Sequence, residues 1–333
     1  MGWKGTVRSI GAAVRAAERE AKRRQRELER QQKQYAKMRE LEQAEYEVEL
    51  YENHIEIIQS LHTECSEPIN WEAIATSQEP QKPENQKIRE HTARLEAENY
   101  TAGFIDKLFK QEGKKKEQLA NNIVKAIKED ETEYRAAIDS WKKALNDWEE
   151  SVDLAKRLLS GNNEAKMKAI KELDPFSEIS ALGSSISFLI NDKEMVEATV
   201  HIHSDNIVPK EIKSLLKSGK LSTKKMPNGR FNEIYQDYVC SCVLRIGNEL
   251  FSVIPDTMVV VTAVDTLLNT KTGHLEEAPI LSVCIPRKTL ESINLNNIDP
   301  SNSMSNFLHN MSFKKAVGFE AVSKISLEDI ETL

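Results

Sequence analysis

The sequence has few cysteines and no long apolar run. Its four cysteines are scattered over 333 residues, too few for the disulfide framework of a small secreted protein. No apolar run approaches the roughly 18 residues that a membrane-spanning helix needs. Residues 1–20 also lack the uninterrupted apolar core of a secretory signal. These absences predict a cytoplasmic chain without a transmembrane segment.

Proline is absent from two long stretches, and this absence outlines the N-terminal half. None occurs in residues 1–67 or 84–174, and three fall between them. Because proline breaks helix interiors, two long helical blocks are predicted around a loop near residues 65–85. The second block carries an apolar stripe at helical spacing, formed by Ile123, Ile127, Tyr134, Ile138, Trp141, Leu145, Trp148, Val152, Ala155 and Leu159.

These patterns predict an elongated, antiparallel, coiled-coil-like helical hairpin over residues 1–174. The charged fraction of 30% fits an extended, solvated element of this kind. The heptad is imperfect, because Glu131 occupies a position of the stripe where an apolar residue is expected. Irregular packing is therefore expected. Such an arm offers a surface for a protein partner or for homo-oligomerisation.

After Pro175 the pattern changes to short strands interleaved with helices. Strands are expected at 185–190, 195–203, 220–226, 257–264, 279–286 and around 318–325. A short helix is expected at 209–219, because Pro209 stands at its start and Gly219 just past its end. A strongly apolar helix is expected at 231–253. The sequence therefore predicts an α+β fold, with a C-terminal α+β domain and mixed sheet at 175–333.

Charge is distributed unevenly along this acidic chain, whose formal net charge is -7. Residues 1–30 carry nine basic and four acidic residues, and residues 39–56 carry one basic and seven acidic residues. The structural interpretation is a solvated helix with local ion pairs. The functional interpretation is a basic tip that binds an acidic protein, a membrane surface or nucleic acid.

The most basic segment of the C-terminal half is 210–230, with seven basic residues against Glu211 alone. It is either a solvated face or a site for an anionic partner such as a nucleic-acid backbone. Aromatic residues are scarce here, with only Phe231 at the end of the segment, so base stacking has little support. The candidate anion-binding residues are Lys210, Lys213, Lys217, Lys220, Lys224, Lys225 and Arg230.

Cysteine and histidine pairs raise the question of a metal or redox site. Cys240 and Cys242 are two residues apart on the expected helix, so their side chains diverge by about 200°. Buried packing is therefore the interpretation for both cysteines. His201 and His203 share a strand face, which can suit a metal, but only Asp205 is a candidate third ligand, and an exposed strand is favoured. No metal and no cofactor are predicted.

One catalytic template fits the order of the C-terminal elements. A helix followed by two strands is the outline of a restriction-endonuclease-like core, in which acidic residues and a lysine hold a divalent metal. The candidates are Asp265, Glu276, Glu277 and Lys288, yet the second strand has no Glu-x-Lys. The leading hypothesis is a non-enzymatic interaction or scaffold protein. The alternative is a metal-dependent nuclease or its inactive relative.

Overall fold

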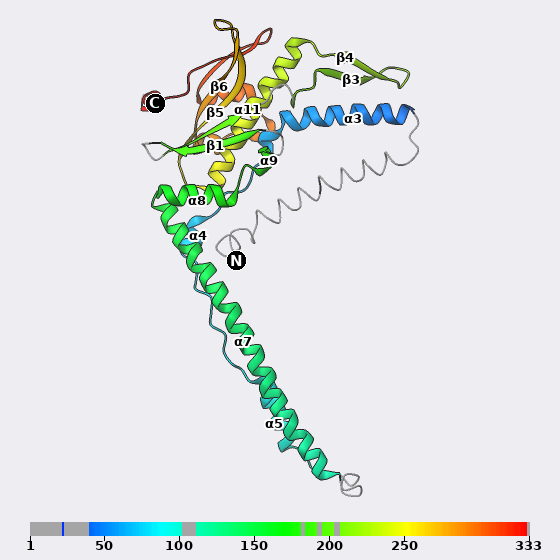
Figure 1. Cartoon of the computed structure of the whole chain (residues 1–333), viewed down its shortest axis with the longest axis vertical. Coiled ribbons are helices and arrows are strands. Elements are labelled where there is room, and N and C mark those ends of the chain that lie inside the picture. The colour runs from blue at the N-terminus through cyan, green and yellow to red at the C-terminus, as the bar shows by residue number, and fades with distance from the viewer. Residues whose placement is uncertain are drawn as a thin grey trace. The chain divides into compact units, whose positions relative to one another are not determined.

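The structure is a computed structural model of the chain (Figure 1). It describes residues 22, 40–101, 111–180, 184–191, 195–202 and 207–331. The predicted basic tip at 1–30, apart from residue 22, lies outside the described residues, as do His203 and Asp205. The chain divides into two compact units. Unit 1 comprises Met1–Val7 and Ala73–Asp153, and unit 2 comprises Arg8–Glu72 and Leu154–Leu333.

Unit 1 contains α5 (Ile88–Glu98) and most of α7 (Glu112–Leu159), the long helix that the proline-free stretch predicts. The segment 77–98 lies along α7 in the opposite direction. Trp148 Nε1 donates to the Oγ atom of Ser77 at 2.9 Å, and Trp141 Nε1 donates to the carbonyl of Pro80 at 2.9 Å. The stretch before α5 is extended, so only part of α7 is paired with a second helix.

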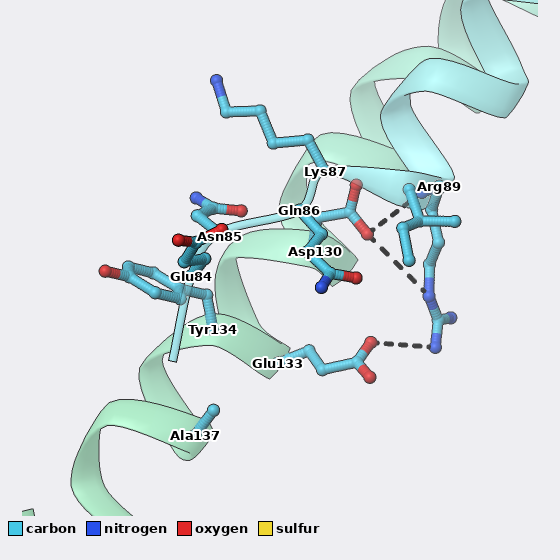
Figure 2. A pocket seen from close by; sticks show the side chains of 10 residues that line it. Glu84, Asn85, Gln86, Lys87, Arg89, Asp130, Glu133, Tyr134 and Ala137 are labelled. Carbon is cyan, nitrogen blue, oxygen red and sulfur yellow. Dashed lines mark hydrogen bonds and ion pairs between the residues drawn. The ribbon is translucent and has the colours of Figure 1, made fainter. Parts of the chain in front are cut away.

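A carboxylate of α7 caps the N-terminus of α5 (Figure 2). Lys87 precedes α5 with a φ of 47° and supplies no side-chain cap. Asp130 accepts instead from the backbone N–H groups of Arg89, at 3.3 Å, and Glu90, at 2.8 Å. The Arg89 guanidinium also donates to Glu133 at 3.1 Å. Because the first N–H groups of a helix lack partners within it, these bonds fix α5 to α7 at one register.

Unit 2 is built on a mixed six-stranded sheet of order β1-β2-β5-β6-β7-β8. The β2–β5 pair is parallel and the other neighbouring pairs are antiparallel. The α+β class and the mixed sheet are thereby confirmed. The strands are β1 (Ser185–Ile190), β2 (Val196–His201), β5 (Met258–Asn269), β6 (His274–Pro286), β7 (Leu308–Lys314) and β8 (Gly318–Glu320).

The core of unit 2 lies around α11 (Asn228–Val253), which contacts β5, β6 and β8. The expected buried helix is confirmed, since 17 of its residues are buried. Cys240 and Cys242 are both fully buried, and burial raises the pKa of the Cys242 thiol to about 12. The cysteines therefore pack as small apolar side chains, as predicted.

A separate two-stranded hairpin holds the basic segment, and here one expectation is wrong. β3 (Glu211–Leu215) and β4 (Leu221–Lys225) pair antiparallel, where a helix was expected at 209–219. Gly219 adopts a φ of 78° in the turn, a conformation that glycine reaches without strain. The glycine taken as a helix end is therefore a hairpin residue.

The remaining elements are short, apart from α3 and α8. All lie wholly in unit 2 except α4, whose last three residues belong to unit 1. The helix α3, which the sequence analysis assigns to the hairpin of 1–174, contacts α11, β3 and β4. Among the described residues, no helix is both long and apolar enough to cross a membrane. The bounds are α3 (Glu40–Gln59), η1 (Leu61–Thr63), α4 (Trp71–Ala75), α8 (Asn163–Leu173), α9 (Ser177–Ser180), α12 (Arg287–Glu291), η2 (Leu295–Asn297), α13 (Pro300–Ser303), η3 (Met304–Asn306) and α14 (Leu327–Glu331).

Candidate interaction surfaces

The basic residues of 210–230 are spread over both faces and the turn of the β3–β4 hairpin. The register pairs Lys213 with Thr223 and Ile212 with Lys224. Since opposed residues share a face and faces alternate along a strand, Lys213 and Lys224 lie on opposite faces. Lys217 and Lys220 flank the turn glycine, Lys210 precedes β3, and Arg230 stands in the first turn of α11. The hairpin is a basic projection rather than one flat basic face.

Part of this positive charge is matched within unit 2 by α3, which carries seven glutamates and no lysine or arginine. The Lys213 ammonium lies 3.0 Å from the Glu47 carboxylate, with side chains about one-third exposed. A Cβ atom added at Gly219 would lie 3.1 Å from Leu41 on the same helix, so α3 reaches the hairpin turn. The acidic helix therefore competes with any outside anion for at least Lys213, whereas Lys217, Lys224 and Lys225 are exposed.

Arg230 lines a pocket of about 520 Å³, to which none of these lysines contributes. Tyr51, His62 and Asn296 also line this pocket. Burial raises the pKa of Tyr51, and the charge of Arg230 acts in the opposite direction. Burial lowers the pKa of His62. Two acidic side chains, Glu52 and Glu56, share the pocket with one arginine, so it does not form an anion site of one sign.

A polar seam on the otherwise apolar α11 was missed by the sequence analysis. It consists of residues at four-residue spacing, which share one helix face, and each binds either the last residue of α3 or the chain between α3 and α4. Arg245 and Glu249 also form an ion pair of 2.7 Å with each other. The α11 seam comprises Asp237 with Gln59 at 2.8 Å, Ser241 with the N–H of His62 at 3.0 Å, Arg245 with the carbonyl of Leu61 at 3.2 Å, and Glu249 with the N–H of Ser66 at 3.2 Å.

The α11 seam is a clasp inside unit 2. Burial raises the pKa of Glu249, and the adjacent Arg245 opposes that shift. Further along, Trp71 Nε1 donates to the carbonyl of Val253 at 2.8 Å. A clasp of this kind positions residues 59–71 on α11, and every group in it is engaged by the chain itself. The sequence signal was the period-four recurrence of polar residues within an apolar helix.

The candidate nuclease residues have separate partners. Asp265 on β5 is buried, accepts from the Tyr235 hydroxyl and accepts from the N–H of Thr266 at 2.8 Å. Glu276 accepts from Asn269 and Thr272 within the β5–β6 turn. In the register of β5 and β6, Glu277 is opposite Thr266 and Glu276 opposite Leu267, so the two glutamates alternate in face.

Lys288 lies in α12, after β6 has ended. His201 Nδ1, at the end of β2, lies 3.6 Å from Glu277 on β6. In the part of the chain that the structure describes, no group of three or more His, Cys, Asp or Glu side chains is placed to hold a metal ion. The structure does not bring the four candidates together around one coordination sphere.

The apolar stripe of α7 is a partly covered surface of unit 1. Its seven members within residues 123–148 are all half-buried. The segment 77–98 covers the stripe, and Lys82 lies 5.6 Å from the centre of the Trp141 ring. Buried side chains are few among the described residues of unit 1, and include Ala93 and Ala126. The stripe therefore keeps part of its apolar area in contact with water.

Comparison with known proteins adds no assignment, because no family model, curated protein or solved structure matches this chain. The function therefore has to be argued from the surfaces themselves. Three of them are relevant: the half-covered stripe of α7, the basic β3–β4 hairpin beside α3, and the edge of the main sheet.

Proposed function

We propose that this chain is a non-enzymatic interaction protein of the cytoplasm, with a helical arm that binds a partner protein and a C-terminal α+β domain that carries a second binding surface. The observation that supports this most is the stripe on α7. Its seven half-buried residues leave apolar area in contact with water along about seven helical turns of 3.6 residues. Burying such area is favourable by about 25 cal/mol per Å².

The partner chemistry that fits the stripe is an amphipathic helix. Helix-in-groove recognition places apolar residues at helical spacing against such a surface, and polar residues at its rim. The helix can come from another protein or from a second copy of this chain, in which case the arm supports homo-oligomerisation. Trp141 and Trp148 are the expected anchors, because tryptophan contributes strongly at interfaces.

The test compares two lysine substitutions on opposite faces of α7. Ile138→Lys introduces a charge into the stripe, whereas Ala136→Lys introduces it two residues away at an exposed position. Both full-length variants are expressed in place of the wild-type chain, and cross-linked partners are identified by mass spectrometry. We expect one set of peptides, cross-linked to residues 112–153, to be lost in Ile138→Lys and kept in Ala136→Lys.

Equal cross-linking of both variants would contradict a partner on the stripe. Circular dichroism controls for loss of helix, because an unfolded arm would lose its partner for a trivial reason. A second variant, Leu145→Lys, has to reproduce the loss, since its side chain lies two turns further along the same stripe.

A second candidate function, binding of nucleic acid or another polyanion, is favoured by the exposure of Lys217, Lys224 and Lys225. Phosphate contacts need clustered positive charge more than a shaped pocket. The ion pair between Lys213 and Glu47 opposes this function by reducing the positive potential on one face. A nuclease activity has less support, because among the described residues no three acidic, His or Cys side chains are placed to hold a metal ion.

A further inference from the structure

We propose that the edge strand β1 pairs with β1 of a second copy of this chain, so that two six-stranded sheets join into one across a two-fold axis. The proposal goes beyond the arm-mediated interaction above and concerns a different surface. In the sheet order, β1 is a terminal strand, and β2 is its neighbour. Its second edge therefore presents backbone N–H and C=O groups that no described strand pairs.

The two terminal strands of the sheet differ in how readily they could accept another strand. β8 spans only Gly318–Glu320, and its Glu320 is paired with Lys314 at 2.7 Å. A short, charged edge is a common protection against pairing between sheets. β1 has six residues, Ser-Ile-Ser-Phe-Leu-Ile, without charge, proline or glycine. Only the β1 edge thus has the composition that favours strand addition.

The burial of β1 also fits an unfilled position beside it. Its residues alternate between exposed and half-buried, and none is buried. On the neighbouring β2, Val196, Ala198 and Val200 are fully buried on the face that continues to Ile190, Phe188 and Ile186. The apolar face of the sheet therefore stays partly open at β1. Leu189, on the other face, is 53% exposed.

A second copy of β1 is the occupant that this sequence matches. A two-fold axis perpendicular to the sheet keeps each face on its own side, so opposed residues must share a face. With Phe188 on the axis, it opposes its own counterpart and Ile186 opposes Ile190 of the second copy. Ser187 then opposes Leu189. The three apolar residues of the inner face all find apolar partners, and no like charges are opposed.

The first test measures the mass of the full-length chain by analytical ultracentrifugation. We expect wild type to reach twice the chain mass of 37.9 kDa at concentrations up to about 100 µM, because a small interface binds weakly. Ser187→Lys places a charge on the exposed face of the edge and should keep the chain monomeric. Ser214→Lys, at an exposed position of β3, is the matched control and should dimerise like wild type.

The second test locates the interface by hydrogen exchange at low and high concentration. We expect added protection of the amides in 185–190 at high concentration in wild type and none in Ser187→Lys. A monomeric wild type would overturn the proposal. So would a dimer that survives Ser187→Lys, or one whose added protection falls on 112–153 and not on β1. That last result would support self-association through the arm. The experiment therefore distinguishes failure of the β1 proposal from failure of the proposed function of the arm.

Discussion

Arg245 and Glu249 form an ion pair of 2.7 Å one turn apart on α11, with side chains only 5% and 1% exposed. A second Arg–Glu pair with four-residue spacing, Glu131 and Arg135 on α7, is 58% and 80% exposed at 3.9 Å. The first pair belongs to the clasp that binds residues 59–71, and the second lies in solvent. Burial rather than spacing decides what each pair contributes.

Removing one partner of the buried pair should destabilise unit 2 strongly. Glu249→Ala leaves the Arg245 charge buried without its carboxylate and deprives the N–H of Ser66 of its acceptor. We expect a loss of about 3–5 kcal/mol of unfolding free energy. Urea denaturation followed by circular dichroism measures it. Glu131→Ala is the control and should leave the midpoint unchanged, and equal shifts in the two variants would contradict the role of the clasp.

The stability of unit 2 should decrease in mild acid because of His62. Burial lowers its pKa, against opposing effects of the Leu295 backbone and Asp299. Just below pH 6.5, the ordinary pKa of histidine, the unfolded chain therefore binds a proton at His62 more readily than the folded chain does. The neutral form is favoured in the folded state, so this contribution is fully present above about pH 6.5 and is lost progressively as the pH falls from that value through the lowered pKa of the folded state.

The measurement is the denaturation midpoint at a series of pH values from neutral to mildly acidic. His62→Gln should be less stable than wild type at neutral pH but should lose less on acidification. His91→Gln, at an exposed position of α5, is the control and should follow wild type. If His62→Gln and wild type have parallel pH profiles, His62 is not the titrating group.

Local patterns in the sequence were sufficient to predict most helices and strands of unit 2. The alternation of Val196, Ala198 and Val200 predicts β2 with its buried face, and the apolar content of 231–253 predicts α11. The helix expected at 209–219 failed because Pro209 and Gly219 are signals shared by helix ends and hairpins. Both signals are local, and they do not show which neighbour the segment will pack against.

Contacts between distant segments were not predicted, for a physical reason. The acidic and basic segments were each visible as charge runs, yet Lys213 and Glu47 are 166 residues apart, and charge alone selects no partner among many. The same holds for the α11 seam, whose polar residues were visible in the sequence but whose partner segment, 59–66, was not. The candidate surfaces therefore follow from tertiary packing rather than from motifs.

Changing Trp141 to alanine should loosen the segment 77–87 from α7. The Trp141 side chain is half-buried, and its Nε1 atom donates to the carbonyl of Pro80. We expect the unfolding free energy to fall by about 1–3 kcal/mol. This is less than for a fully buried tryptophan, since only part of the Trp141 surface is covered. Hydrogen exchange of residues 77–87 should become faster, while α7 stays helical. Lys142→Ala, at an adjacent exposed position, should leave exchange unchanged, and an unchanged rate in Trp141→Ala would show that this contact does not hold the segment.

The basic hairpin gives the last prediction, in which two variants should change binding in opposite directions. If Lys217, Lys224 and Lys225 contact phosphates, affinity for DNA or RNA should fall steeply with salt, because each contact releases condensed counterion. Reversing these three charges to glutamate should abolish binding while the fold is kept. Glu47→Lys should strengthen binding, because it removes the acidic competitor of Lys213 and adds a positive charge beside the hairpin.

Fluorescence anisotropy with labelled duplex and single strands over a salt series measures the affinity of wild type and of both variants. Little sequence preference is expected, because lysine acts as a point charge and the hairpin offers few groups to read base edges. Glu131→Lys, a reversal of the same kind on an exposed part of α7, controls for the change in net charge. Equal strengthening by Glu47→Lys and Glu131→Lys would assign the effect to net charge alone. Absence of binding by wild type at low salt would exclude nucleic acid as the partner of the hairpin and leave an acidic protein surface as its counterpart.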